Sequence, residues 1–232
     1  MNSVKIIDPA SLKMWLPFEN DFTDKSGNGV SCTNVGGLGY ADSPIGRGIQ
    51  FVGGTTKYID VPVAVFNALT GAMALRTRFI NEYNPAYATN IQMSWYRDNN
   101  NRGYIWCGTS DGGNNWLVGI ANNVSGSWVF AITTTAKYKT GQLLDIVYTV
   151  DTSNNYILAI NGAVELSGTN ANAHPKVTGT ATKFQNGATW YAGAINGEAA
   201  KGIFTDTFIH SKAFTDKEIS YFHYAKKHFY GG

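Results

Sequence analysis

Apolar and polar residues alternate with a period of two along much of the chain. The pattern is clearest in residues 73–80, MALRTRFI, and predicts a half-buried β-strand. One face of this strand collects Met73, Leu75, Thr77 and Phe79, and the other collects Ala74, Arg76 and Arg78. Two further predicted strands, at 127–133 and 143–151, place together Trp128, Phe130 and Ile132 in the first and Leu144, Ile146, Tyr148 and Val150 in the second.

The other apolar segments also predict short strands. Residues 155–166 contain two strand pieces around Asn161-Gly162, the dipeptide that most strongly predicts a two-residue hairpin turn. Residues 188–195 and 202–211 predict two more strands, and clusters of Asn, Asp, Gly and Ser separate the strands. This spacing is typical of a sandwich or a barrel. No linker-like tract divides the chain, so we predict one domain over residues 1–232.

One helix is predicted near the C-terminus. Thr215 and Glu218 have the spacing of a capping box, with Thr at the N-cap and Glu three residues later. Phe214 and Ile219 occupy the two positions of a hydrophobic staple. Gly231-Gly232 is a suitable end for this helix.

Composition supports an all-β class and excludes some partners. The 232 residues include 26 glycines, 13% aromatic residues and only 15% charged residues, which is typical of strands joined by many turns. The formal net charge of +2 gives no reason to expect binding to nucleic acid or to an anionic membrane surface. No apolar run approaches the roughly 20 residues of a membrane span, so membrane insertion is not expected.

The N-terminal segment and the cysteines bear on the compartment. Residues 1–15, MNSVKIIDPASLKMW, lack the continuous apolar segment and cleavage site of a signal peptide. Cys32 and Cys107 are far apart in sequence. A single disulfide between them is possible, but two buried thiols in a reducing compartment are the favoured interpretation.

Four blocks of sequence resemble a known family of β-sandwiches. Residues 14–29, MWLPFENDFTDKSGNG, are similar to the aromatic opening strand and the Asp-x-Ser-Gly-Asn-Gly turn of laminin-G-like, concanavalin A-type jelly rolls. Residues 46–62, 141–163 and 202–222 are similar to later blocks of the same family, in the family's order. The resemblance implies an all-β, concanavalin A-like jelly-roll β-sandwich of two antiparallel sheets with a short C-terminal helix.

The same resemblance implies a structural calcium ion, which many family members hold where the first and last strands lie near each other. Calcium binds about six to eight hard oxygen ligands. Its candidate ligands here are Glu19, Asn20, Asp24, Asn28 and Asp206. The family's usual Asp before the final strand corresponds to Thr205, so Asp206 or a carbonyl would have to replace it. The alternative is that Asp24, Ser26 and Asn28 cap their own turn through side-chain to backbone hydrogen bonds.

A glycan-cleaving enzyme on this scaffold would need two nearby carboxylates. Laminarinase-like hydrolases carry Glu-x-Asp-x-(x)-Glu on one strand, which holds two glutamates about 5 Å apart. No two glutamates in this chain are closer than twenty residues: Glu19, Glu82, Glu165, Glu198 and Glu218. The histidines show no metal-binding pattern. The sequence therefore favours a protein that is not an enzyme, with a glycoside hydrolase or lyase as the alternative.

Residues 95–116, WYRDNNNRGYIWCGTSDGGNNW, have the best concentration of groups that bind sugars. Aromatic rings cover the apolar side of a pyranose, and Asn, Asp and Arg bond its hydroxyls. The candidates are Trp95, Tyr96, Arg97, Asn100, Arg102, Tyr104, Trp106 and Trp116. Because alternation turns about half of the aromatic residues inward, each tryptophan also has a core role as an alternative. Arg76 and Arg78 would be exposed cations that contact a partner or keep the sheet soluble.

These features favour a non-catalytic recognition, adhesion or decoration module that binds a glycan or neighbouring protein subunits. A phage virion fits the missing export pattern together with the composition, because such proteins are made in the host cytoplasm and leave by lysis. We therefore expect a capsid accessory or tail-associated protein in an oligomer or assembly. An extracellular or cell-surface location is the alternative, and no cofactor besides calcium is indicated.

Overall fold

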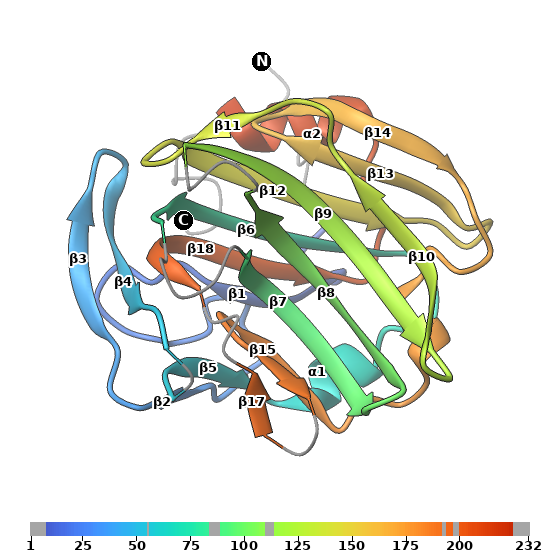
Figure 1. Ribbon diagram of the computed structural model, residues 1–232, viewed down its shortest axis with the longest axis horizontal. Coiled ribbons are helices and arrows are strands. Elements are labelled where there is room, and N and C mark those ends of the chain that lie inside the picture. The colour runs from blue at the N-terminus through green and yellow to red at the C-terminus, as the bar shows by residue number, and fades with distance from the viewer. Residues whose placement is uncertain are drawn as a thin grey trace.

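Two antiparallel β-sheets lie one in front of the other and form the body of the molecule (Figure 1). The computed structural model describes residues 8–54, 56–83, 89–109, 114–191, 194–196 and 200–224. The first sheet has eight strands, and β1 pairs with β18 at its side. Its strand order is β14 (Ala163–Thr169), β13 (Asn155–Ile160), β12 (Leu143–Val150), β6 (Met73–Asn81), β18 (Lys201–His210), β4 (Gly46–Val52) and β3 (Gly39–Ser43), with β1 (Leu12–Leu16) beside it.

The second sheet also has eight strands, and β11 pairs with β9 at its side. Its strand order is β10 (Ser127–Thr133), β9 (Asn115–Val124), β8 (Asn101–Gly108), β7 (Thr89–Asp98), β15 (Lys183–Asn186), β5 (Tyr58–Val61) and β2 (Thr33–Val35), with β11 (Tyr138–Lys139) beside it. The other elements are a hairpin of β16 (Thr189–Tyr191) and β17 (Ala194–Asn196), and the helices α1 (Val63–Asn67), η1 (Pro175–Thr178) and α2 (Asp216–Tyr224). Among the described residues, no helix has the length and apolar character needed to cross a membrane. The predicted all-β fold of two antiparallel sheets with a short C-terminal helix is confirmed.

The alternation predicted for residues 73–80 is confirmed in β6. Met73, Leu75 and Phe79 belong to the main core between the sheets, whereas Ala74 faces the opposite side and packs in a second apolar cluster. The hairpin turn predicted at Asn161-Gly162 is also confirmed. Both turn residues have positive φ angles, 54° and 80°, which suit the twist of the flanking strands β13 and β14.

Helix α2 begins at the predicted capping box. The backbone N–H of Thr215 donates to Glu218 Oε2 at 2.8 Å, and the backbone N–H of Glu218 donates to Thr215 Oγ1 at 3.3 Å. The helix covers the outer face of the first sheet, where Ile219 and Phe222 pack into the second apolar cluster. The predicted end of the helix at Gly231-Gly232 lies outside the described residues.

Arg76 and Arg78 are covered, which corrects the expectation of two exposed cations. Arg76 is 2% exposed, and its Nε and Nη2 donate to the two oxygens of Asp145 at 2.6 and 2.8 Å. Its Nη1 lies 3.3 Å from Asp206 Oδ2, and Arg78 Nε lies 3.6 Å from Asp145 Oδ2. His223 of α2 completes the contacts, with its Nδ1 3.0 Å from Asp145 Oδ2. We call Arg76, Arg78, Asp145 and Asp206 the buried ion network.

His210 makes folding sensitive to mild acid. Its ring is fully buried between Phe208 and Phe214, and burial lowers the pKa of His210 to about 3. An unfolded imidazole titrates near pH 6.5, so the unfolded state binds the proton first as the pH falls. We expect this residue to lower the free energy of unfolding by about 2 kcal/mol between pH 7 and pH 5. Denaturant titrations across this range measure the slope, and His210→Leu should flatten it; an unchanged slope would contradict the prediction.

Candidate functional site

Five side chains form a row across the outer face of the second sheet, the face turned away from the main core. The pairing of the strands places Lys183 opposite Tyr96, Tyr96 opposite Arg102, Arg102 opposite Asn123, and Asn123 opposite Trp128. Directly opposite residues share a face of the sheet. Neighbouring strands lie about 4.8 Å apart, so the row spans roughly 19 Å over its five strands. We call these five residues the cross-strand row.

Trp106 lies flat against the same face, over two glycines. It follows Arg102 by four residues on β8, so both side chains point to the outer face. A Cβ atom added to Gly119, its partner on β9, would lie 2.5 Å from Trp106 Cε2. A Cβ atom added to Gly108 would lie 2.5 Å from Trp106 Cζ3. Because glycine stands at both positions, the indole rests on the backbone with one ring face against the sheet.

Tyr104 and Trp128 extend this aromatic surface toward the cross-strand row. The two rings meet edge to face, with centroids 5.5 Å apart and an interplanar angle of 70°. The guanidinium of Arg102 stacks over Trp128 at 5.4 Å from the ring centroid. Trp128 is 47% exposed, and Tyr104 and Trp106 are partly exposed. We call Tyr104, Trp106 and Trp128 the aromatic platform.

A β-bulge brings Trp128 to this face, and the alternation pattern did not reveal it. The sequence places Trp128, Phe130 and Ile132 together, but the register with β9 shifts between Trp128 and Phe130. One extra residue in β10 turns Trp128 outward, while Phe130 is 4% exposed and belongs to the main core. The expectation of one shared face was therefore wrong for Trp128, which is the platform residue that the candidate segment at 95–116 did not include.

Two of the predicted ligand-binding residues belong to the core. Trp95 and Trp116 are both fully buried, which corrects their placement on a binding surface. The ring of Trp95 stacks on Phe66 of α1 at 5.8 Å, and Trp116 Nε1 donates to Thr140 Oγ1 at 2.7 Å. Strand alternation explains the position of Trp95, which precedes the outward-facing Tyr96 by one residue.

The remaining predicted residues fall into two groups. Tyr96, Arg102, Tyr104 and Trp106 lie on the outer face, as described above. Arg97 and Asn100 are exposed at the end of the β7–β8 hairpin and are not members of the row. The nearby Asp98 accepts hydrogen bonds from the Asn101 side chain at 2.8 Å and from the Asn100 backbone at 2.9 Å, which hold the pKa of Asp98 below its usual value.

Two polar side chains help to define this surface: Asn123 is part of it, and Ser94 lies where one of its edges is covered. Asn123 lies in the row between Arg102 and Trp128, is 2% exposed, and its Oδ1 has no hydrogen-bond partner within the described part of the chain. An unpaired buried amide oxygen is costly and accepts any donor that reaches it. On the other side, Ser94 Oγ donates to Ala188 O at 2.6 Å and is 2% exposed. The segment that leads into β16 therefore covers the face next to β7.

The predicted calcium ligands do not converge on one site. Asp24 Oδ1 accepts the backbone N–H groups of Trp15 and Ser26, both at 2.9 Å. Asp24 Oδ2 accepts Ser26 Oγ at 2.7 Å and the Val30 N–H at 3.1 Å. Asn28 uses its amide N–H₂ to bond Leu12 O at 2.7 Å. The turn therefore caps itself, as the alternative interpretation of the sequence states.

The other three candidates lie outside this turn. Asp206 accepts the indole N–H of Trp15 at 2.7 Å and belongs to the buried ion network. Glu19 and Asn20 are exposed, and Asn20 Oδ1 lies 3.4 Å from Arg47 Nη1. No group of three or more His, Cys, Asp or Glu that could hold a metal ion occurs among the residues that the structure describes. The residues present do not fit the calcium site that the resemblance implies.

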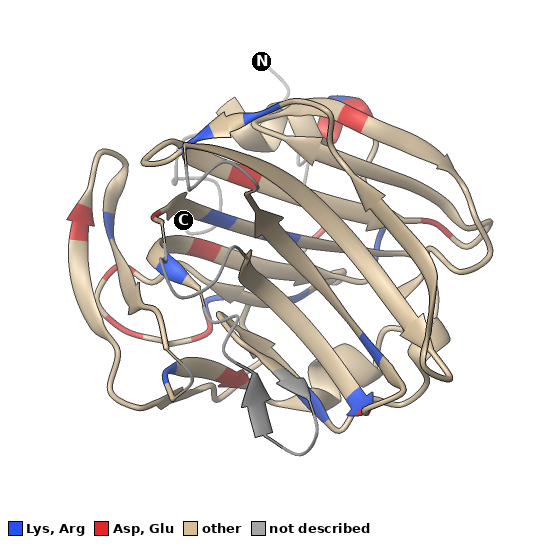
Figure 2. Ribbon diagram, in the orientation of Figure 1, with Lys and Arg blue, Asp and Glu red and all other residues tan. Residues whose placement is uncertain are grey.

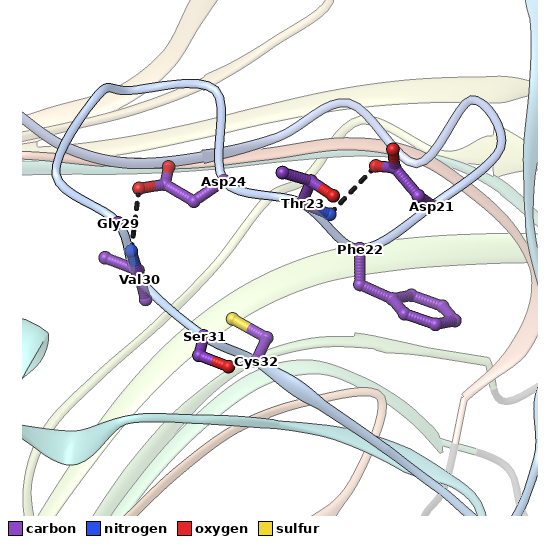
Figure 3. A pocket seen from close by; sticks show the side chains of 8 residues that line it. All are labelled: Asp21, Phe22, Thr23, Asp24, Gly29, Val30, Ser31 and Cys32. Atoms are coloured by element: carbon purple, nitrogen blue, oxygen red, sulfur yellow. Dashed lines mark hydrogen bonds between the residues drawn. The ribbon is translucent and has the colours of Figure 1, made fainter.

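A pocket of about 410 Å³ lies beside this turn (Figure 3). Asp21 and Asp24 lie at opposite ends of it, and each is turned to its own stretch of backbone, Asp21 to the Thr23 N–H and Asp24 to the Val30 N–H. Burial raises the pKa of Cys32, which also lines the pocket, to about 12. Cys32 and Cys107 are both free thiols. The pocket therefore offers neither paired carboxylates nor a reactive thiolate.

Asp24 is expected to stabilise the fold without an ion. Asp24→Ala removes the acceptor of four hydrogen bonds and should lower the free energy of unfolding by about 1–3 kcal/mol. Saturating EDTA should leave the melting temperature of the unaltered protein unchanged. Thermal melts of both proteins, with and without chelator, provide the measurement. A chelator-dependent fall in the melting temperature of the unaltered protein would contradict this account.

The outer face of the second sheet has almost no carboxylates. Strands β7 to β10 contain a single acidic residue, Asp98, which lies at the hairpin end and pairs with Arg97 at 3.6 Å. Glycoside hydrolysis requires two carboxyl groups on either side of the scissile bond. These four strands therefore cannot supply that pair.

No protein-family model and no curated protein matches this sequence. Solved structures with the same fold do match. One is domain 4 of AbnA, an extracellular arabinanase of family GH43 from Geobacillus stearothermophilus, in complex with arabinotriose; it has a TM-score of 0.65 and 22% identity, covering 90% of this chain and 97% of that one. A second is the CBM40 module of the Ruminococcus gnavus IT-sialidase bound to α2,3-sialyllactose, with a TM-score of 0.63 and 14% identity, covering 81% of this chain and 100% of the module.

A third similar structure is the binding domain of botulinum neurotoxin DC in complex with rat synaptotagmin II. It has a TM-score of 0.65 and 12% identity, covering 95% of this chain and 52% of that one, so this chain spans about half of that domain. These similarities establish that the chain has the jelly-roll β-sandwich fold that these binding domains share.

Proposed function

We propose that this protein is a non-catalytic glycan-binding module and that the aromatic platform with the cross-strand row is its binding surface. The observation that carries the proposal is the seating of Trp106, which glycine at positions 108 and 119 allows to lie flat on the outer face. A flat, partly exposed indole is the surface that stacks against the apolar side of a sugar ring. Tyr104 and Trp128 enlarge that surface.

Polar groups for sugar hydroxyls lie within the same surface. The cross-strand row combines the polar residues Lys183, Arg102 and Asn123 with the aromatic residues Tyr96 and Trp128. Binding sites for small ligands combine apolar walls with a few placed polar groups in this way. The estimated 19 Å of the row is long enough for a short oligosaccharide.

Structures of the same fold support this proposal. The AbnA domain was solved with arabinotriose and the CBM40 module with sialyllactose. The neurotoxin domain was solved with a protein receptor, so a protein partner on this fold is the second candidate. Our reason to favour a glycan is the flat aromatic platform, because a protein-binding face does not require glycines beneath its tryptophan.

The setting that we propose is a larger assembly, in particular a phage particle on which the module would act as a capsid accessory or tail-associated protein. The two free thiols agree with synthesis in a reducing cytoplasm. An electron-microscopy reconstruction of particles that contain the protein would test this part. It predicts contacts with neighbouring subunits that leave the aromatic platform uncovered.

A glycan array tests the proposed function directly. The purified protein should bind a defined set of immobilised oligosaccharides, and mass spectrometry should show no cleavage of the bound sugars. Binding to no glycan would overturn the proposal. Release of shorter sugars or unsaturated products would replace it with the enzyme alternative.

A further inference from the structure

The cross-strand row carries two cations and no carboxylate. Lys183 and Arg102 stand on either side of Tyr96, on β15 and β8. Two strand spacings separate them, which corresponds to about 10 Å. Figure 2 shows Lys and Arg segments at the adjoining ends of β7, β8 and β15. This end of the binding surface is therefore positive, although the whole chain has a formal net charge of only +2.

Among the described residues, two acidic groups lie near the row, and both have contacts with residues outside it. Asp98 pairs with Arg97 at 3.6 Å and accepts hydrogen bonds from Asn100 and Asn101. Asp60, on β5, lies 3.3 Å from the side-chain nitrogen of Gln185. Neither aspartate belongs to the row, whose charged members are Lys183 and Arg102.

Arg102 is held in place by the Trp128 ring and by the β7–β8 turn, where its Nη1 donates to the Asn99 carbonyl oxygen. Its guanidinium stacks on Trp128 at 5.4 Å, and Tyr104 follows it by two residues on the same face of β8. A planar guanidinium bonds a carboxylate or a sulfate through two parallel N–H groups, whereas an ammonium acts as a point charge. A sugar stacked beside Tyr104 and Trp128 would bring a charged substituent to this group.

We propose that the module selects acidic oligosaccharides, with Arg102 and Lys183 binding a carboxylate or sulfate group of the sugar. This inference rests on the proposed glycan-binding function and names its class of ligand. The aromatic platform provides the stacking surface, and the two cations provide the preference for an anionic sugar over its neutral counterpart.

The test uses matched sugars that differ only in the acidic group: lactose, 3′-sialyllactose and 3′-sulfated lactose, together with a wider array of neutral and acidic oligosaccharides. We expect acidic members to bind about tenfold to a hundredfold more tightly than their neutral counterparts, the range expected for hydrogen bonds to a charged group. Affinity for them should fall as salt rises. The carboxylated and sulfated arms show which anion the site prefers.

Three variants locate the effect. Arg102→Gln and Lys183→Gln should each remove most of the preference, so that acidic and neutral partners bind each variant with affinities that differ by only about twofold to threefold. Lys139→Gln removes the same charge from an exposed position on β11, at the far end of the sheet, and should change nothing. Circular dichroism of each variant confirms that it is folded.

The outcomes separate this inference from the proposed function. Equal binding of neutral and acidic partners, or a preference that survives both row variants, would overturn the inference and leave a glycan-binding module. Binding to no sugar would overturn both. Tighter binding of a single-stranded oligodeoxynucleotide than of any acidic sugar would also overturn the inference, because it would assign the cations to phosphate recognition.

Discussion

Asp145→Ala is expected to lower the free energy of unfolding by about 3–5 kcal/mol, the cost of removing one partner from a buried ion pair. Asp145 is 1% exposed and contacts Arg76, Arg78 and His223. Burial alone would raise the pKa of Asp145, but the charge and hydrogen bonds of Arg76 outweigh it and hold the pKa well below its usual range. The carboxylate is therefore ionised at neutral pH, and its loss leaves Arg76 without its strongest partner.

Denaturant unfolding at neutral pH measures this effect, with two controls. Lys25→Ala removes one partner of an exposed ion pair, whose atoms lie 3.6 Å apart, and should cost less than about 1 kcal/mol. The double variant Arg76→Met with Asp145→Leu should be more stable than Asp145→Ala, because it replaces the pair with apolar groups. A loss below about 1 kcal/mol for Asp145→Ala would contradict the expected cost of leaving Arg76 buried without this partner.

Trp106→Ala is expected to weaken glycan binding by about 30-fold or more, which corresponds to the 2 kcal/mol or more that a central tryptophan contributes to a binding surface. The side chain is partly exposed and lies on the outer face, so its removal should cost little stability. Isothermal titration with the best sugar from the array gives the affinity. An affinity within twofold of the unaltered protein would place the binding surface elsewhere.

A pair of glycine variants tests whether binding depends on the flat placement of Trp106, without removing its ring. Gly119→Ala places a methyl group 2.5 Å from the indole of Trp106 and should tilt it off the sheet. We expect binding to weaken about tenfold, which corresponds to about 1.4 kcal/mol. Gly39→Ala is the matched control, because a Cβ atom there meets nothing within 4 Å. Equal affinities for the two variants would contradict a flat seating of Trp106 as the basis of binding.

Local patterns in the sequence predicted the local structure well. The alternation in β6, the Asn161-Gly162 turn and the capping box at Thr215 each depend on residues close together in the chain, and the structure confirms all three. The resemblance of four blocks to jelly-roll sandwiches placed these elements in the right architecture.

The misassigned residues are those whose environment comes from distant parts of the chain. Alternation predicts exposed side chains for Arg76 and Arg78, but Asp145, Asp206 and α2, which cover them, lie far along the sequence. Alternation predicts the wrong face for Trp128. The bulge adds one residue to β10, and the order of apolar and polar residue types does not show that extra residue. For residues 95–116 the alternation predicted that about half of the aromatic side chains would be inside, but only the register showed that these include Trp95 and Trp116.

The indole N–H signals of the tryptophans in an NMR titration test the central claim most directly. As the best glycan from the array is added to the labelled protein, the signals of Trp106 and Trp128 should move, because both rings belong to the binding surface. The signals of Trp95 and Trp116, which are fully buried in the core, should stay in place. If the protein is saturated with glycan and the signals of Trp106 and Trp128 have not moved, the account is contradicted and the binding site lies on another face.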